Sequence, residues 1–294
     1  MSHRDRAWNV QLRERRGLLA IVTASNPKID LLAHTLMDCH RQGALHPRPS
    51  EGHEEFDVAA AYRVLDAIST RRRAAGWQVI GRKIGFTNRS IWARYGVSHP
   101  IWAPMWSNTV HFADRDDATL EISRLAQPRI EPEVVFKLKS PLSSTDDAEE
   151  LLRAVEWLAP GFEIVQCHYP DWKFSAADCI ADFGLHAALV IGTPAPIAAA
   201  GAGRWATALA TFGATLLRGS ETIDRGGGAL VLGSPLFALA YLARGLAASG
   251  QPSLRAGEIV TTGTLTDAWP VTAGEAWSAD YSSLATRPLS IRFT

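Results

Sequence analysis

The sequence has few cysteines, no excess of charge of either sign and no long apolar run. Cys39, Cys167 and Cys179 form no CxxC pair, which argues against a disulfide scaffold or a zinc knuckle and fits a reducing compartment. The 30 basic and 30 acidic side chains balance, so the net charge does not point to nucleic acid or an anionic membrane. No segment reaches the roughly 18 uninterrupted apolar residues of a membrane span, and the N-terminus lacks a signal-peptide layout. We therefore expect a cytoplasmic protein that binds neither nucleic acid nor a membrane.

What is present is a chain long enough for one large domain with an appendage. Of its 294 residues 47% are hydrophobic, which supports a sizeable core. Residues 1–75 are predicted as a helical N-terminal region, in which Asp57 caps a helix with one apolar face. That face carries Val58, Ala61, Leu65 and Ile68. From Trp77 the composition changes, and residues 76–294 are predicted as a β-rich body.

Several elements of this body can be predicted from local patterns. We expect strands at 77–86, 129–138, 162–167, 207–216, 229–232, 258–266 and 288–293. A capping box of Ser144 and Asp147 predicts a helix that ends at Pro160. Its inner face would carry Leu151, Val155 and Leu158. A second helix should start with Ser234 as cap and Pro235 as its first residue.

The segment R-I-E-P-E-V-V-F-K-L, residues 129–138, holds two carboxylates in a strand that reads as buried. Strand side chains alternate between faces, so Glu131 and Glu133 point the same way. Glu163 lies in the next predicted strand, and three converging carboxylates need a compensating cation, for which oxygen ligands favour Mg²⁺ or Mn²⁺. The same pair also fits a solvated strand face. Pro132 inside the strand predicts an edge position or a bulge.

Six segments in register resemble a known family. They are R-I-E-P-E-V-V-F-K-L, G-R-K-I-G-F-T (81–87), F-E-I-V with D-W-K (162–173), A-D (181–182), G-G-G-A-L-V-L-G-S-P-L-F-A-L-A-Y-L (226–242) and G-E-I-V-T-T-G-T-L-T (257–266). Together they resemble the fumarylacetoacetate hydrolase superfamily, and within it the 2-keto-4-pentenoate hydratase and 4-oxalocrotonate decarboxylase family. The resemblance covers roughly residues 55–294. It implies an α+β fold, a twisted mixed β-roll with flanking helices, and a homo-oligomer.

The resemblance also implies a site and a chemistry. Glu131, Glu133 and Glu163 would bind a divalent metal, Mg²⁺ or Mn²⁺, and Lys83 would be the active-site lysine. The backbone around Ile84 and the hydroxyl of Thr264 would contact the substrate. Lys173 is a weaker candidate for substrate binding, because an ion pair with Asp171 explains it equally well. The substrates implied are small 2-oxo acids and 2-hydroxy-dienoates of aromatic catabolism, which a lyase of this family hydrates or decarboxylates.

Two departures from the family pattern bear on the reaction. Ile101 follows Pro100 where the hydratases carry an aspartate, and the loop after Asp182 has Phe183 and Leu185 in place of polar residues. Both changes favour a drier distal pocket for a different or bulkier substrate. We expect Trp102 and Trp106 to line that pocket.

Two other functions fit the sequence. His53 and Glu54, in H-E-E-F, lie where acylpyruvate hydrolases of the superfamily carry a water-activating His-Glu pair on a lid, and histidine is a competent base near neutral pH. The chain would then cleave the C–C bond of a fumarylpyruvate- or maleylpyruvate-type substrate. Alternatively, the loss of polar groups would make the chain a non-catalytic partner subunit, although the three carboxylates and Lys83 are retained.

Overall fold

A mixed sheet forms the centre of the protein. The computed structural model describes residues 26–51, 56–97, 99–142, 144–197, 202–282, 284 and 286–294. In this part of the chain the main sheet has the order β2 (Ile101–Trp106), β1 (Val79–Gly85), β11 (Ile259–Thr264), β5 (Arg129–Leu138), β6 (Val155–Val165), β7 (His186–Ile191) and β3 (Val110–Phe112). The short strands β12 (Trp269–Pro270) and β8 (Ala195–Pro196) pair with β5 and β6. Most neighbours are antiparallel, but β1 runs parallel to β11 and β3 to β7.

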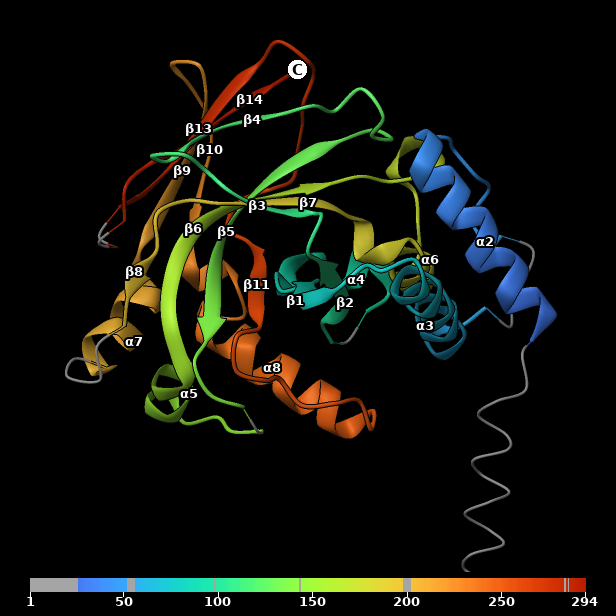
Figure 1. The fold of residues 1–294 in the computed structure, drawn as a ribbon. Helices are drawn as coiled ribbons and strands as arrows, with labels where there is room; N and C mark the ends of the chain where they lie inside the picture. Colours follow the sequence, from blue (N-terminus) through green and yellow to red (C-terminus); the bar gives the residue numbers. More distant parts are fainter. Residues whose placement is uncertain are drawn as a thin grey trace, which may run out of the picture.

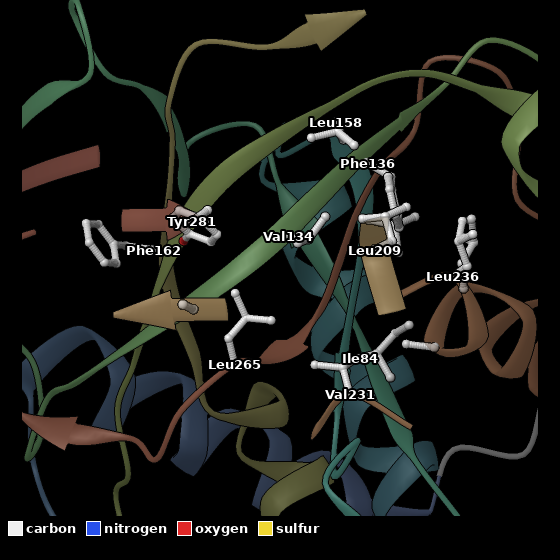
Figure 2. Close-up of a cluster of buried hydrophobic side chains, with 14 of the residues drawn as sticks. Ile84, Val134, Phe136, Leu158, Phe162, Leu209, Val231, Leu236, Leu265 and Tyr281 are labelled. Carbon is white, nitrogen blue, oxygen red and sulfur yellow. The ribbon is translucent and has the colours of Figure 1, made fainter. Parts of the chain in front are cut away.

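A second sheet packs against the first. Its order is β10 (Glu221–Gly227), β9 (Gly213–Arg218), β13 (Ala276–Ser282), β14 (Leu289–Phe293) and β4 (Asp117–Leu120). The largest buried cluster joins side chains of β5, β6 and β13 with those of helices α7 (Ala202–Thr211) and α8 (Pro235–Ala248). Figure 2 shows Val134 in the middle of this cluster, with Phe162 and Tyr281 on one side of it and Leu209 and Leu236 on the other. The main core therefore lies between the two sheets and the helices α7 and α8.

Helices cover the sheet on two sides (Figure 1). The first group consists of α2 (Pro27–Gln42), α3 (Val58–Ala74) and α6 (Ala176–Ala181), which share a second buried cluster with β2 and the end of β6. The second group consists of α5 (Ala148–Ala154), α7 and α8. Short turns of helix complete the chain: η1 (Arg89–Ile91), α4 (Trp92–Tyr95), η2 (Pro170–Trp172), η3 (Phe183–Leu185) and η4 (Gly228–Leu230).

The predicted α+β class and several element boundaries are confirmed. Asp57 caps α3 by accepting a hydrogen bond from Ala60 N at 2.7 Å, and Ser234 caps α8, which has Pro235 in its first turn. Gly228–Ala248 has the length and hydropathy of a membrane span, but 61% of its apolar 18-residue stretch is buried inside the protein. This is the character of a core helix. The division of the chain at residue 75 stays a prediction.

Three predicted elements are wrong. The capping box predicted for Ser144 and Asp147 is replaced by Asp147 alone as the N-cap of α5. This helix ends at Ala154, and Val155, Leu158 and Pro160 belong to strand β6. Nearly all of β6 is buried, so its apolar residues show no alternation and their spacing looked helical. The predicted strand 207–216 is the end of α7 followed by β9, and 229–232 is the turn η4 with two following residues.

Pro132 does not lie on an edge strand. Strand β5 pairs with β6 on one side and β11 on the other. The irregularity lies in β11, where Thr261 pairs with Val135 but Thr264 pairs with Glu133, so β11 carries one extra residue beside the proline. Pro132 has no N–H to donate to a neighbouring strand, and the bulge interrupts the regular hydrogen-bond ladder at this position. It also shapes the site described next.

Candidate metal and substrate site

Three carboxylates meet where β5 and β6 pair. The antiparallel register places Glu131 directly opposite Glu163, and Glu133 lies two residues further along the same face of β5. One oxygen from each carboxylate lies within 4.8 Å of the others. Glu133 and Glu163 are 0% exposed, and Glu131 is partly buried. A solvated strand face is therefore excluded.

The bulge in β11 holds Glu133. Gly263 N donates a hydrogen bond to Glu133 Oε2 at 2.7 Å. Gly263 has a φ of +98°, and a Cβ there would lie 1.9 Å from Thr87 Oγ1. Both facts require glycine at this position. The other oxygen, Glu133 Oε1, is buried and has no hydrogen-bond partner among the described residues, as expected of an atom that awaits a ligand.

Lys83 reaches the carboxylates from β1. Its Nζ lies 3.1 Å from Glu163 Oε2 and donates to the carbonyl of Gly184 at 2.9 Å. Burial alone would lower the pKa of Lys83, but the negative charges of Glu163, Glu131 and Glu133 outweigh it and raise the pKa above its ordinary value. Lys83 is therefore an ammonium ion in the metal-free protein. It places a positive charge beside the carboxylates.

A histidine that the sequence patterns did not single out also binds Glu163. His186 Nδ1 lies 2.8 Å from Glu163 Oε1, and His186 Nε2 lies 2.9 Å from Thr109 Oγ1. Burial lowers the pKa of His186. Burial opposes ionisation of Glu163 too, but Lys83 and the hydrogen bond from His186 lower the pKa of Glu163 to about 2. The only sequence signal was a polar ring at the start of an otherwise apolar strand.

The charges of the site do not balance within the described residues. Burial raises the pKa of Glu131 to about 7, with Lys83 opposing the shift and Glu163 adding to it. Burial and the two neighbouring carboxylates raise the pKa of Glu133 well above its usual range. Three carboxylates beside one ammonium, with one oxygen lacking a partner, form an oxygen donor set that suits a hard divalent cation.

A cavity of about 370 Å³ opens from this point. At its inner end it is lined by Lys83, Ile84 and Glu131, with Thr264 further along. Ile84 lines the cavity although its side chain belongs to the buried core, and contact of its backbone with a substrate stays a prediction. Thr264 Oγ1 donates to the carbonyl of Thr266 at 2.9 Å and accepts from Thr266 N at 3.4 Å, which leaves one lone pair free to accept from a ligand.

The family profile described as fumarylacetoacetate (FAA) hydrolase C-terminal matches residues 96–286, more than half of the chain. The chain belongs to this family. A 2-hydroxyhexa-2,4-dienoate hydratase from Comamonas testosteroni is 32% identical over 250 residues, 83% of this chain and 89% of the relative. A 4-oxalocrotonate decarboxylase from Pseudomonas sp. (strain CF600) is 29% identical over 252 residues, 84% of this chain and 89% of the relative.

Solved structures of family members agree with the fold. A 4-oxalocrotonate decarboxylase from Pseudomonas putida G7, complexed with magnesium and adipate, has a TM-score of 0.83 at 26% identity. The match covers 92% of this chain and 99% of that chain. A fumarylpyruvate hydrolase from Pseudomonas aeruginosa, complexed with Mn²⁺ and pyruvate, has a TM-score of 0.55 at 17% identity, and this likeness shows the fold alone.

Not every predicted residue of the family site reaches the cavity. Lys173 has a 72% exposed side chain, pairs with Asp171 at 3.4 Å and does not appear among the described residues of the cavity wall. The ion pair with Asp171, not the cavity, therefore explains its position. His53 and Glu54 lie outside the described residues.

The prediction that Trp102 and Trp106 line the cavity is wrong. Trp102 packs against Tyr62, at 5.2 Å between ring centroids, and against Gly245 of α8. Trp106 lies under the guanidinium of Arg72. The tryptophans that line the cavity are Trp172 and Trp269. Of the two apolar departures, Leu185 lines the cavity, whereas Ile101 is buried in the cluster beneath the helices.

Proposed function

We propose that this chain is a divalent-metal-dependent lyase that acts on 2-hydroxy-dienoates and their 2-oxo tautomers, as a hydratase or as the related decarboxylase. The observation that carries the proposal is the set of three carboxylates within 4.8 Å of one another, beside Lys83 at the buried end of a cavity. The relatives named as hydratases and decarboxylases support it. Glu131, Glu133 and Glu163 would hold Mg²⁺ or Mn²⁺.

When bound, the metal ion would supply a Lewis acid for the carboxylate and 2-oxygen of the substrate. Lys83 has three N–H donors, of which one is used by Gly184 and one faces Glu163. The third can point into the cavity, toward a substrate carboxylate or the negative charge that develops on an enolate. The backbone at Ile84 and the hydroxyl of Thr264 would hold the substrate along the cavity wall.

The pairing of Glu163 with Lys83 and His186 gives this carboxylate a fixed position. A ligand held on two sides loses little freedom when an ion binds, and such outer contacts commonly orient metal ligands. Gly263 fixes Glu133 in the same way through its backbone N–H. The chain therefore offers a preformed ligand set.

Product analysis by NMR would test the proposal. The purified protein with Mg²⁺ is incubated with 2-hydroxypenta-2,4-dienoate, 4-oxalocrotonate or maleylpyruvate, with a chelator and the Glu131→Gln variant as controls. A hydrated product or released carbon dioxide, lost in both controls, supports the lyase. Cleavage into two acids would support the hydrolase instead. Full turnover in chelator would refute the metal-dependent proposal.

The setting of the enzyme is part of the same proposal. We expect a cytoplasmic homo-oligomer that meets its partner, a small 2-oxo acid, in the catabolism of aromatic compounds. Size-exclusion chromatography with light scattering would measure the number of subunits. If all three compounds are left unchanged while the chain forms a stable complex with an active family member, the non-catalytic subunit becomes the better account.

A further inference from the structure

The outer part of the cavity is walled by aromatic rings. The inner end, around Lys83 and Gly263, is buried, whereas the residues toward the opening are only partly buried. We call the five aromatic residues of this outer part the aromatic box: Phe86, Tyr95, Trp172, Phe174 and Trp269. None of them was predicted to line the site. They come from four separate segments of the chain.

Four of the five rings form one continuous wall. Tyr95 and Phe174 are stacked, with centroids 5.2 Å apart and planes at 13°. Phe86 extends the wall on one side, 5.3 Å from Tyr95, and Trp172 on the other, 6.1 Å from Phe174. Rings at these separations support each other in fixed positions. The wall is therefore a built surface for a flat apolar group.

Trp269 of β12 completes the box. Its indole N–H donates to Asp224 Oδ2 at 2.9 Å, and the indole N–H of Trp172 donates to the carbonyl of Gln127 at 2.9 Å. Both polar groups are thus already paired within the protein. What the two rings offer the cavity is their apolar surface.

The cavity is larger than the smallest family substrate requires. Its volume of about 370 Å³ corresponds to roughly 12 water molecules at their share of the liquid. This exceeds the number of non-hydrogen atoms in a five-carbon 2-hydroxy-dienoate. A substrate with its head at the carboxylates would leave the aromatic box filled with water, which is unfavourable beside so much apolar surface.

Arg129 in the outer cavity suggests a different ligand, one with a second carboxylate at its far end. Arg129, two residues before Glu131 on the same face of β5, would suit a second carboxylate. However, its guanidinium lies over the ring of Trp172, 4.0 Å from the centroid, and donates to the carbonyl of Ala268 at 3.4 Å. The carboxylate of Asp267, an exposed residue of the cavity wall, would also repel a second negative charge.

From these observations we propose that the aromatic box selects 2-oxo acids whose far end carries an aryl ring or a comparably bulky apolar group. Tyr95, Phe174 and Trp269 are the specificity-determining residues. This inference rests on the proposed function, because it assumes that the 2-oxo acid head binds at the carboxylates.

Binding of unreactive 2-oxo acids tests the inference. The Mg²⁺-loaded full chain is titrated in a calorimeter with 2-oxobutanoate, 2-oxo-4-phenylbutanoate and 2-oxoadipate, which differ only in the group at the far end. We expect the phenyl compound to bind at least about tenfold more tightly than 2-oxobutanoate, the factor expected for burying one ring against others. Equal affinities, or tightest binding of the diacid, would overturn the inference.

Variants locate the effect. Tyr95→Leu and Trp269→Val should each lower the affinity for the phenyl compound about three- to tenfold and leave that for 2-oxobutanoate unchanged. Phe112→Leu is the matched control, because Phe112 is 58% exposed on β3 and outside the cavity wall. If both box variants keep the wild-type preference, the box does not set specificity. If the wild type binds none of the three acids, both the proposed function and this inference are wrong. If it binds all three with equal affinity, only this inference is wrong.

Discussion

Raising the pH from 6 to 8 should destabilise the metal-free protein through Glu131. Burial raises the pKa of this carboxyl from 4.5 to about 7, with Lys83 opposing the shift and Glu163 adding to it. An unfolded chain returns it to its ordinary value. Between the two pKa values the folded state binds more protons than the unfolded state, so the free energy of unfolding decreases as the pH rises. The raised pKa of Glu133 acts in the same direction, whereas the lowered pKa values of the buried His40 and His186 act in the opposite direction, so the contribution of Glu131 is measured against a variant.

The size of the effect follows from the two pKa values. Integrating the proton difference for Glu131 from pH 6 to pH 8 gives a loss of about 1.3 kcal/mol. Because Glu131 is only partly buried, solvent screening reduces this figure to about 1 kcal/mol. The depressed pKa of Glu163 contributes no slope here, since this carboxyl is ionised in both states throughout the range.

Urea denaturation in a chelator, at pH 6 and pH 8, measures this loss. Glu131→Gln is the control, because the amide keeps the shape and does not titrate. The wild type should lose about 1 kcal/mol more than the variant between the two pH values. Saturating Mg²⁺ should stabilise the wild type more at pH 8 than at pH 6, since binding requires ionised carboxylates. Equal pH slopes for wild type and variant in chelator would refute the reasoning.

Substitutions at three positions test other parts of the account. Lys83→Met should lower turnover at least about 100-fold. The Mg²⁺ affinity, measured by calorimetry, should stay the same or rise, because the substitution removes a positive charge beside the carboxylates. Loss of Mg²⁺ binding in this variant would contradict the account. His186→Leu should weaken Mg²⁺ binding about tenfold. His186→Asn should keep most of the affinity, because its amide nitrogen replaces Nδ1 as the donor to Glu163. Equal loss of affinity in both variants would show that Mg²⁺ binding does not depend on this hydrogen bond. Gly263→Ala should lower the free energy of unfolding by about 1–3 kcal/mol, because its Cβ would meet Thr87; an unchanged thermal midpoint would show that the bulge tolerates a side chain.

That Glu131 and Glu133 share one face could be predicted because a local rule is enough for this pair. Alternation along β5 places Glu131 and Glu133 on one face whatever the rest of the fold does. Glu163 was predicted from the next strand, and the register of β5 with β6 places it opposite Glu131. The caps of α3 and α8 were equally accessible, since each depends on one side chain and the backbone beside it.

The errors occurred where long-range packing decides. Strand β6 is buried along almost its whole length, so its sequence carries no alternating pattern to separate it from a helix. The cavity wall is assembled from segments far apart in the chain. Trp102 and Trp106 were expected in the wall because they follow Ile101 in the segment that departs from the family pattern, whereas Trp269 reaches the site only because β12 pairs with β5.

His186 shows a further limit of local reasoning. A histidine in an apolar strand is consistent with a satisfied core side chain. Its role depends on the register of β6 with β7, which brings it to Glu163, and on Thr109 from another loop. The contacts of His186 with Glu163 and Thr109 therefore cannot be predicted from residue spacing in the sequence.

The most direct test of the central claim is a calorimetric titration of Mg²⁺ into the metal-free protein, with the Glu133→Gln variant alongside. Glu133 is fully buried, and its Oε1 has no partner among the described residues, so the amide changes the ligand set with the least change in shape. The account predicts one Mg²⁺ per chain for the wild type, with proton release, and at least about a hundredfold weaker binding to the variant. The same affinity for both proteins, or no saturable binding to the wild type, would contradict it.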